Sequence, residues 1–261
     1  GLELSEKQYV ERLRDLFEDG VKVRLISDVP LGAFLSGGID SAAVVAFMTR
    51  IMKQPVKTFA IGFTDDPSFN ELRYARIVAK EFRSDHHEFL VSPVAIDLLP
   101  KLVWHYDQPF ADSSAIPSFL VAQMTREHVK VALTGDGADE LFAGYERFAA
   151  ARIAENYRRM PRSLQSAVKQ LLGIIPEATT YRSFGRRARR FVHGAVLPLS
   201  ERYLRWVGIF SSDLINDLLV DRSDWHPIAH FEAYFDSEHE NDLTGQLLSV
   251  NMKSYLPGDL L

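Results

Sequence analysis

The sequence contains no cysteine, and this absence removes several classes of site at once. Without thiols the chain cannot form disulfides, hold zinc or an iron–sulfur cluster through cysteine, or use a cysteine nucleophile. A cysteine-free composition fits a reducing compartment, and we expect the protein in the cytoplasm. Long hydrophobic runs are missing too. None approaches the ~20 residues of a membrane helix, and the first residues are not a signal peptide, so we expect no membrane partner.

A marked excess of one charge is also absent. The 261 residues include 30 Lys and Arg against 35 Asp and Glu, a formal net charge of −5, which gives no overall attraction to nucleic acid. The hydrophobic fraction of 46% and charged fraction of 25% are typical of a folded globular protein and exclude disordered and collagen-like chains. One basic cluster stands out, and without accompanying aromatic residues it favours a solvated helix face or an internal contact: Arg182, Arg186, Arg187, Arg189 and Arg190.

Strand-like and helix-like segments alternate over the first 145 residues. Ser5 is the expected N-cap of an amphipathic helix that reaches Arg24. Short links between later segments imply right-handed βαβ units and therefore a doubly wound parallel sheet covered on both faces. Residues 146–261 carry helical patterns and few strands, so we expect an α/β core over 1–145 and a mainly helical lobe over 146–261. The expected strands are 30–35, 56–63, 87–91 and 129–133, and the expected helices are 39–52, 70–82, 95–106 and 118–128.

A glycine turn between the first of these strands and its helix carries the strongest chemical signal, Ser36-Gly37-Gly38-Ile39-Asp40-Ser41. Two glycines let the backbone turn tightly and present N–H groups, and the following helix directs its positive N-terminus at an anion. Ser36 and Ser41 add hydroxyl donors for phosphate. Because Asp40 repels phosphate unless a divalent cation lies between them, its presence indicates Mg²⁺. The alternative is a simple turn in which Ser36 or Asp40 caps the helix.

A second glycine turn, Thr134-Gly135-Asp136-Gly137, follows the strand expected at 129–133. In a doubly wound sheet this turn lies beside the first one, so two carboxyl-end turns share one edge. Asp139 would then join Asp40 on the same Mg²⁺, where it bridges the β- and γ-phosphates of a departing pyrophosphate. The alternative is that Asp136 and Asp139 only cap the helix after the turn.

Two further polar groups permit more than one interpretation. His86-His87-Glu88 invites a metal site, but adjacent strand residues point to opposite faces, so we expect a turn or strand-edge role. The run Asp112-Ser113-Ser114 precedes Ile116-Pro117 and is a good helix start. A contact with a substrate carboxylate or amine is an equally open interpretation of those three residues.

The glycine turn resembles the PP-loop of the ATP pyrophosphatases, an adenine nucleotide alpha hydrolase-like fold. Four ordered motifs narrow the resemblance to the synthetase domain of the glutamine-hydrolysing asparagine synthetase family. They are Asp28 to Ser41; Phe69-Asn70-Glu71 with Tyr74-Ala75 and Asp85 to Glu88; Asp107-Gln108-Pro109-Phe110-Ala111 to Pro117; and Leu133 to Tyr145. Beyond residue 145 the likeness is loose until Tyr255 to Leu261, which is similar to the opening of another family segment.

The resemblance implies ATP and Mg²⁺ as cofactors and an amide-forming ligase as the activity. A carboxylate, most simply the side chain of aspartate, is adenylated, and ammonia then displaces AMP to give asparagine. Asp40 and Asp139 would hold the metal, and Asp136 would face the reacting centre, which makes these three the candidate catalytic residues. The side chains of Phe34 and Ile61 are alternatively ordinary core residues. The nucleotide contacts implied are Phe34, Leu35, Ser36, Gly37, Gly38, Asp40, Ser41, Ile61, Thr134 and Gly135.

The same resemblance has implications for the substrates of the chain and for the neighbouring segments that family members carry. Glutamine-hydrolysing relatives carry an upstream glutaminase domain with a cysteine nucleophile, and a transition-state lysine lies downstream of the segment near Tyr255. We therefore expect this chain to be an excised synthetase core that lacks both, with ammonia and a small carboxylate as its partners. Self-association into a homo-oligomer is left open. The rival hypotheses are a PP-loop enzyme that modifies tRNA and a non-catalytic nucleotide-binding or assembly domain.

Overall fold

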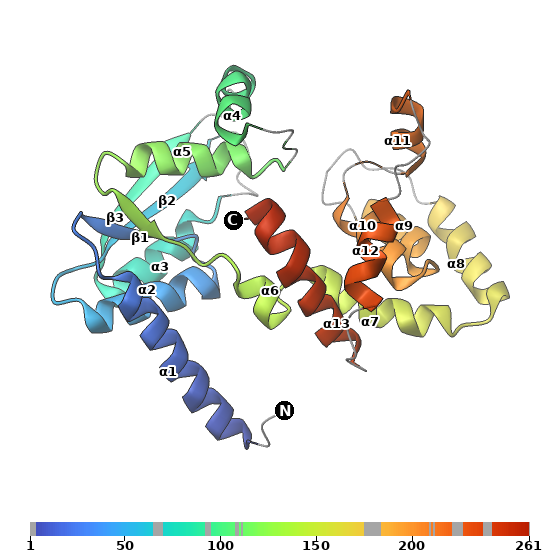
Figure 1. The fold of residues 1–261 in the computed structure, drawn as a ribbon, viewed down its shortest axis with the longest axis horizontal. Coiled ribbons are helices and arrows are strands. Elements are labelled where there is room, and N and C mark those ends of the chain that lie inside the picture. Colours follow the sequence, from blue (N-terminus) through green and yellow to red (C-terminus); the bar gives the residue numbers. More distant parts are fainter. Residues whose placement is uncertain are drawn as a thin grey trace. The chain divides into compact units, whose positions relative to one another are not determined.

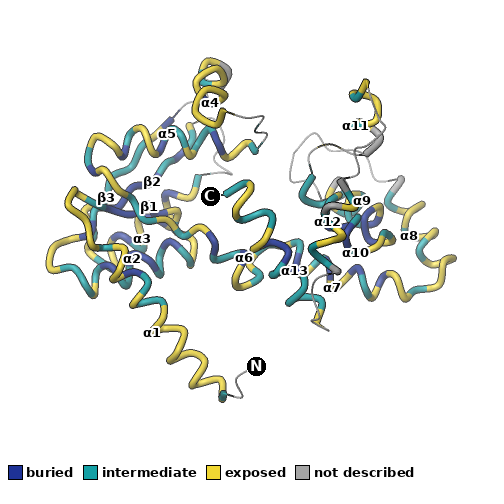
Figure 2. Tube along the Cα trace, viewed as in Figure 1, coloured by how far each residue is buried: buried dark blue, intermediate teal, exposed yellow. Residues whose placement is uncertain are grey.

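The computed structural model describes residues 4–64, 70–91, 95–107, 110, 112–174, 184–208, 210, 212–220, 227–236 and 242–260. The chain divides into two compact units, Gly1–Asp136 and Gly137–Leu261, which we call unit 1 and unit 2. Each unit has its own buried core, shown in dark blue in Figure 2.

Unit 1 is built on a parallel four-stranded sheet with the strand order β3-β2-β1-β4 (Figure 1). Strand β1 pairs with β2 on one side, where Ala33 lies opposite Thr58, and with β4 on the other, where Ala33 lies opposite Leu133. The chain leaves β1 toward β2 and returns beyond β1 as β4, so the order reverses between β1 and β4. This is the predicted doubly wound arrangement. The strands are β1 Leu31–Phe34, β2 Lys57–Phe63, β3 Asp85–Val91 and β4 Val131–Leu133.

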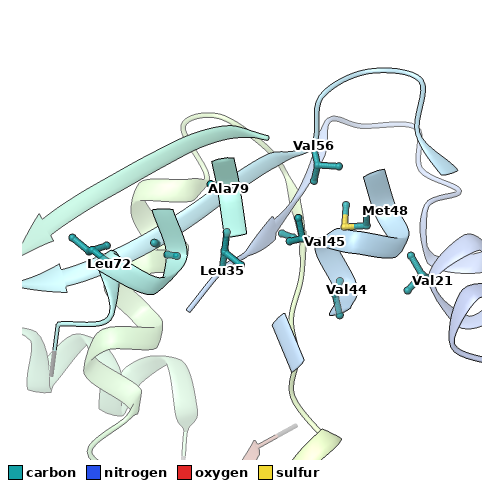
Figure 3. Close-up of a cluster of buried hydrophobic side chains, with 11 residues drawn as sticks. Val21, Leu35, Val44, Val45, Met48, Val56, Leu72 and Ala79 are labelled. Carbon is teal, nitrogen blue, oxygen red and sulfur yellow. The ribbon is translucent and has the colours of Figure 1, made fainter. Parts of the chain in front are cut away.

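Helices cover both faces of this sheet, as Figure 1 shows. On one face lies the core of unit 1, in which Val44, Val45 and Met48 of α2 pack with Leu35 and neighbouring residues (Figure 3). Helix α3 adds Leu72, Ala75 and Ala79 to this cluster at the three- and four-residue spacing of one helical face. The helices are α1 Glu6–Arg24, α2 Ile39–Ile51, α3 Leu72–Phe82, a 3₁₀ turn Ala95–Leu98, α4 Leu99–Tyr106 and α5 Ala115–Thr125.

Helix α1 begins as predicted at an N-cap serine. The Ser5 hydroxyl accepts a hydrogen bond from the Gln8 backbone N–H, and the Gln8 side chain accepts one from the Ser5 N–H at 2.9 Å, which completes a capping box. The second half of α1 joins the core, through buried Val21 and half-buried Phe17. The first half of the helix is exposed along its length (Figure 2).

Several element boundaries differ from the sequence prediction, and three of these differences have a clear local cause. Strand β3 starts at Asp85 because its early polar residues find partners: Asp85 N–H donates to Val56 O, and the His86 ring bonds to the Thr58 hydroxyl at 2.8 Å. Helix α5 starts at Ala115 and ends at Thr125, whose carbonyl accepts the N–H groups of the turn that follows. The helix expected over 95–106 divides into the 3₁₀ turn and α4, with a proline in the first turn of α4.

Unit 2 is helical in its described residues. Helix α7 contributes to two hydrophobic clusters, with Phe148 and Ala151 in one and Ala154 and Tyr157 in the other. Its elements are α6 Ala138–Phe142, α7 Glu146–Arg158, α8 Arg162–Ile174, α9 Phe184–Ala195, α10 Leu199–Val207, α11 Ser212–Leu218, α12 Pro227–Asp236, α13 Leu243–Val250 and a π-helical segment Asn251–Leu260.

Trp206 of α10 packs against both clusters of unit 2. Its ring stacks on Phe191 with centroids 6.2 Å apart. The indole also lies directly on Gly194, where an added Cβ would stand 2.5 Å from Nε1. The glycine of α9 therefore permits the close approach of α9 and α10.

A fully buried arginine lies in the same unit. Arg202 is 0% exposed, and its Nη2 donates to Glu155 Oε1 at 2.9 Å and to Leu197 O at 3.2 Å. Burial raises the pKa of Glu155, but the hydrogen bond from Arg202 and the nearby positive charges outweigh it and hold that pKa below its usual value. Nε and Nη1 of Arg202 have no hydrogen-bond partner among the described residues. Arg202 also lines a cavity of about 10 Å³, room for about one water molecule.

Candidate active site

The turn after β1 carries its serines in contact with each other. Ser36 Oγ and Ser41 Oγ lie 3.0 Å apart, the Gly38 N–H donates to Ser36 Oγ at 3.2 Å, and the Ser41 hydroxyl donates to Gly38 O at 3.3 Å. The N-cap of α2 is Gly38, and no side chain caps the helix. The alternative in which Ser36 or Asp40 caps α2 is therefore wrong. Asp40 lies half-buried in the first turn of the helix.

Gly37 is required by the path of this turn. Its φ of +84° lies in the left-handed region, and a Cβ at this position would lie 2.5 Å from both Tyr74 Cβ and Ala75 N. The first turn of α3 thus packs against the backbone of the glycine turn. The motif containing Tyr74-Ala75 contacts the loop here, while Phe69 of the same motif lies outside the described residues.

The turn after β4 lies against the start of α2. A Cβ added to Gly135 would stand 2.9 Å from Ser41 N and 3.1 Å from Asp40 Cβ. Thr134, Gly135 and Asp136 thus follow β4 at the strand end adjacent to that of β1, as expected from the strand order. The Thr134 hydroxyl accepts a hydrogen bond from Asp136 N–H at 3.3 Å, and the side chains of Thr134 and Asp136 are exposed.

Asp139 is described with unit 2, in the first turn of α6. The N-cap of that helix is Gly137, with φ +92°, and it makes no side-chain cap hydrogen bond. Neither Asp136 nor Asp139 is therefore the N-cap residue. Asp139 is half-buried, whereas its neighbour Glu140 is 1% exposed. Sequence reasoning missed the burial of Glu140, because an acid in the first turn of a helix usually faces solvent.

The three apolar residues expected near adenine occupy different environments. Leu35 is buried in the core, and its N–H donates to Phe59 O at 2.8 Å. Phe34 borders a groove of about 520 Å³ that α4, α5 and β4 also line. Ile61 is half-buried in β2, in register with Phe89 of β3.

The run Asp112-Ser113-Ser114 starts α5. Asp112 Oδ1 accepts the Ser114 N–H at 2.7 Å, the Asp112 carbonyl accepts Ala115 N–H at 3.2 Å, and Ser114 occupies the N-cap position. The helix-start interpretation is therefore confirmed, and a role with substrate stays a proposal. Gln108, Pro109 and Ala111 of this motif lie outside the described residues.

The two histidines of β3 point to opposite faces, as predicted. His86 contacts Thr58, and its Nε2 lies 3.4 Å from Glu88 Oε1. Arg76 donates two hydrogen bonds to the Glu88 carboxylate, of 2.7 and 2.6 Å. His87 stacks on Phe59 on the other face. Burial lowers the pKa of His86, although the Glu88 charge opposes this. No cluster of three or more His, Asp or Glu able to hold a metal occurs among the described residues.

The basic cluster makes contacts inside unit 2. Arg189 Nε donates to Leu172 O near the end of α8, and Arg190 Nη2 donates to Trp206 O at the end of α10. Arg187 forms an ion pair with Glu146. Guanidinium groups suit helix C-termini because carbonyls there lack helical partners. Arg182 and the side chain of Arg186 lie outside the described part of the chain.

Within the described residues, no helix is both long and apolar enough to cross a bilayer.

Comparison with known sequences places this geometry in context. The sequence model of the asparagine synthase family matches residues 12–261. The chain is 31% identical over its full length to asparagine synthetase [glutamine-hydrolyzing] 1 of Bacillus subtilis, and it covers 40% of that protein. It is 32% identical over 98% of its length to a putative asparagine synthetase [glutamine-hydrolyzing] of Mycobacterium tuberculosis H37Rv, of which it covers 38%. The chain thus spans about two fifths of the length of these relatives.

One solved structure is also similar, an NH3-dependent NAD synthetase from Campylobacter jejuni. It aligns with 80% of this chain and 99% of its own length, at 13% identity and a TM-score of 0.33, a similarity too low to support an inference.

Proposed function

Since the chain belongs to the asparagine synthase family, we propose that it is an ATP-dependent ligase domain that converts a carboxylate into an amide. The side chain of aspartate is the proposed substrate and asparagine the proposed product. Ammonia is the proposed nitrogen donor, supplied by a glutaminase domain of the full-length protein. The close packing of the turns after β1 and β4 is the structural observation that best supports this function.

The turn after β1 is suited to hold the triphosphate. Gly37 and Gly38 place no side chain over the loop, Ser36 and Ser41 supply hydroxyls, and no side chain caps the N-terminus of α2. These groups would bind the pyrophosphate and stabilise the charge that develops on it as it leaves. The backbone at Phe34 to Ser36 and at Thr134-Gly135, with Ile61, is proposed to contact adenine.

The residues present also fit a magnesium ion. Asp40 is half-buried in the first turn of α2, next to Ser41 in the sequence, and the absence of a Cβ at Gly135 lets the turn after β4 approach both residues. Carboxylate and hydroxyl oxygens are the hard ligands that Mg²⁺ prefers. We assign Asp40 and Asp139 as its protein ligands. When bound, the ion neutralises the charge of the β- and γ-phosphates.

The proposed reaction proceeds in two displacements. A carboxylate oxygen of the substrate attacks the α-phosphorus of ATP, and the bond to pyrophosphate breaks to leave an acyl-adenylate. Ammonia then attacks the acyl carbon, loses a proton, and expels AMP. The role of Asp136 is to orient the substrate at the reacting centre. Asp112, Ser113 and Ser114 are the proposed substrate contacts. Positioning and charge neutralisation supply most of the rate enhancement.

Exchange of labelled pyrophosphate into ATP tests this function, measured with aspartate and other carboxylic acids. We expect exchange that depends on the added carboxylic acid, and a loss of about 100-fold in Asp40→Asn, because this change removes a proposed ligand of the ion that neutralises the leaving group. Asp97→Asn, an exposed acid of the same unit, is the matched control and should exchange normally.

The rival hypotheses predict different results. ATP binding without exchange for any acid would favour a non-catalytic nucleotide-binding or assembly domain. Pyrophosphate release that requires tRNA would favour a modifying enzyme. The internal contacts of Arg187, Arg189 and Arg190 give no support to the second alternative.

A further inference from the structure

The two residues after the C-cap of α6, Gly144 and Tyr145, contact two consecutive acids of that helix. We propose that Gly144 and Tyr145 are positioning residues that together fix the carboxylate of Asp139. The inference rests on the proposed function, in which Asp139 holds the metal ion. It assigns a role to two residues that make no contact with the nucleotide in that scheme.

Gly144 determines where the Asp139 side chain can lie. Helix α6 has five residues and ends at Phe142, and its C-cap Ala143, with a φ of +59°, turns the chain back toward the helix. The Gly144 N–H then donates to the Asp139 carbonyl at 3.2 Å. A Cβ added at Gly144 would overlap Asp139 Oδ1 and lie 3.0 Å from its Cγ. The carboxylate therefore lies on the bare backbone of Gly144, in space that any other residue would fill.

Tyr145 holds the neighbouring acid. Glu140 is 1% exposed, and its Oε1 accepts the hydrogen bond of the Tyr145 hydroxyl. Its Oε2 is buried and has no hydrogen-bond partner within the described residues. Tyr145 thus makes the hydrogen bond that keeps the Glu140 carboxyl inside the unit. Because Asp139 and Glu140 share a peptide plane, a fixed Glu140 also fixes the backbone of Asp139.

The tyrosine is itself immobilised by its surroundings. The Arg147 guanidinium lies 3.6 Å from the centroid of the Tyr145 ring, and the Tyr255 ring packs edge-on at 6.0 Å. Arg147 in turn donates to Asn251 Oδ1 at 2.8 Å, which ties it to the π-helical segment. Burial and the adjacent Glu140 raise the pKa of the Tyr145 phenol, so the hydroxyl remains a hydrogen-bond donor.

These contacts give the side chains of Asp139 and Glu140 different degrees of burial. Glu140 is drawn into the unit by Tyr145, and Asp139 is left half-buried over Gly144. A residue that orients a metal ligand through a neighbour typically changes metal affinity by 10- to 100-fold when it is altered. We expect effects of this size from changes at Gly144 or Tyr145.

The test uses two variants and two matched controls in the full 261-residue chain. Tyr145→Phe removes the hydroxyl, and Gly144→Ala fills the space beneath Asp139. Tyr157→Phe removes a comparable buried hydrogen bond of unit 2, from its hydroxyl to Gln165 O at 3.1 Å. Gly258→Ala adds a Cβ with no atom within 4 Å. Mn²⁺ affinity in the presence of ATP is measured by electron paramagnetic resonance, and hydrogen exchange of the residue 144 amide by NMR.

We expect both variants to weaken Mn²⁺ binding at least 10-fold and to accelerate exchange of the residue 144 amide, with both controls within 2-fold of the parent protein. Unchanged exchange in Tyr145→Phe overturns the proposal, even if that variant melts at a lower temperature. The same holds if Tyr157→Phe weakens Mn²⁺ binding as much as Tyr145→Phe does.

Asp139→Asn separates this proposal from the proposed function. If that variant binds Mn²⁺ as tightly as the parent, Asp139 is not a metal ligand and the metal assignment fails. Faster amide exchange in Tyr145→Phe would still support the positioning role in that case. Weak binding by Asp139→Asn with normal binding by Tyr145→Phe overturns the positioning role and supports the metal assignment.

Discussion

Gly37 shows how strongly one residue constrains the candidate site. Its left-handed backbone and its contact with Tyr74 and Ala75 leave no room for a side chain. Gly38, the next residue, has an ordinary φ of −69°, and its nearest neighbour would be 3.3 Å from an added Cβ. The two glycines of the turn are therefore not equivalent.

We predict that Gly37→Ala lowers the free energy of unfolding by about 2–4 kcal/mol, from backbone strain together with steric overlap. ATP affinity should fall with it, because the turn must move. Gly38→Ala should cost about 1 kcal/mol or less. Urea unfolding and calorimetric ATP titration of both variants measure these effects. Equal losses of stability from the two substitutions would contradict the conclusion that Gly37 and Gly38 are not equivalent.

Single residues also mark where sequence reasoning stopped. The serines, glycines and Asp40 were predictable, because phosphate binding requires such groups at a strand-to-helix turn. The burial of Glu140 and Arg202 was not, because isolated charges are rarely buried and their partners lie in other parts of the fold. The one available signal for Glu140 was a tyrosine five residues later, which is too weak to use alone.

At the scale of the element, β3 places its two histidines in separate environments. The His86 ring bonds to the Thr58 hydroxyl, which also bonds to the Ser84 hydroxyl, and Glu88 and Arg76 lie nearby. His87 stacks on Phe59 instead. Burial lowers the pKa of His86, so the folded protein favours the neutral imidazole.

The lowered pKa of His86 makes the stability of the folded protein depend on pH, with a definite sign. The unfolded chain binds a proton at His86 near its ordinary pKa of 6.5, and the folded chain binds it only at lower pH. Stability is therefore fully present above about pH 6.5 and is lost as the pH falls toward the folded pKa. His86→Gln should flatten this part of the stability profile, and His105→Gln, at an exposed position of α4, should not. An unchanged profile in His86→Gln would be the contrary result.

Helices and strands with a clear hydrophobic pattern were predicted well, whereas the ends of elements with a weak pattern were not. The α2 prediction was accurate to one residue, because alternation of strand and helix is clear there. The early start of β3 depends on contacts with Val56 and Thr58. The early start of α5 depends on the hydrogen bond that the Asp112 side chain accepts from the Ser114 N–H. The approach of Gly135 to Ser41 joins residues 94 positions apart, so it could be expected only through the order of the strands.

At the scale of the molecule, each compact unit has its own core, and that of unit 2 encloses a charge. Arg202→Met should lower the stability of unit 2 by about 2–3 kcal/mol, since Glu155 loses its buried partner but retains Arg158 and some solvent. Arg202→Met combined with Glu155→Gln should recover part of the loss. Hydrogen exchange of α7 and α10 measures the effect, with α2 and α3 as the internal reference. Uniform acceleration in both sets would refute a local effect.

The packing of Trp206 gives the protein a built-in optical reporter. Of its three tryptophans, Trp104 on α4 is 80% exposed, while Trp206 is enclosed by Phe191, Gly194 and both clusters of unit 2. An indole in apolar surroundings emits at shorter wavelength than one in water. Replacing Trp104 and Trp225 by Phe would leave a single emitter that follows the helical unit alone. Its spectrum would record the loosening caused by Arg202→Met in real time, without attached dyes or isotopes.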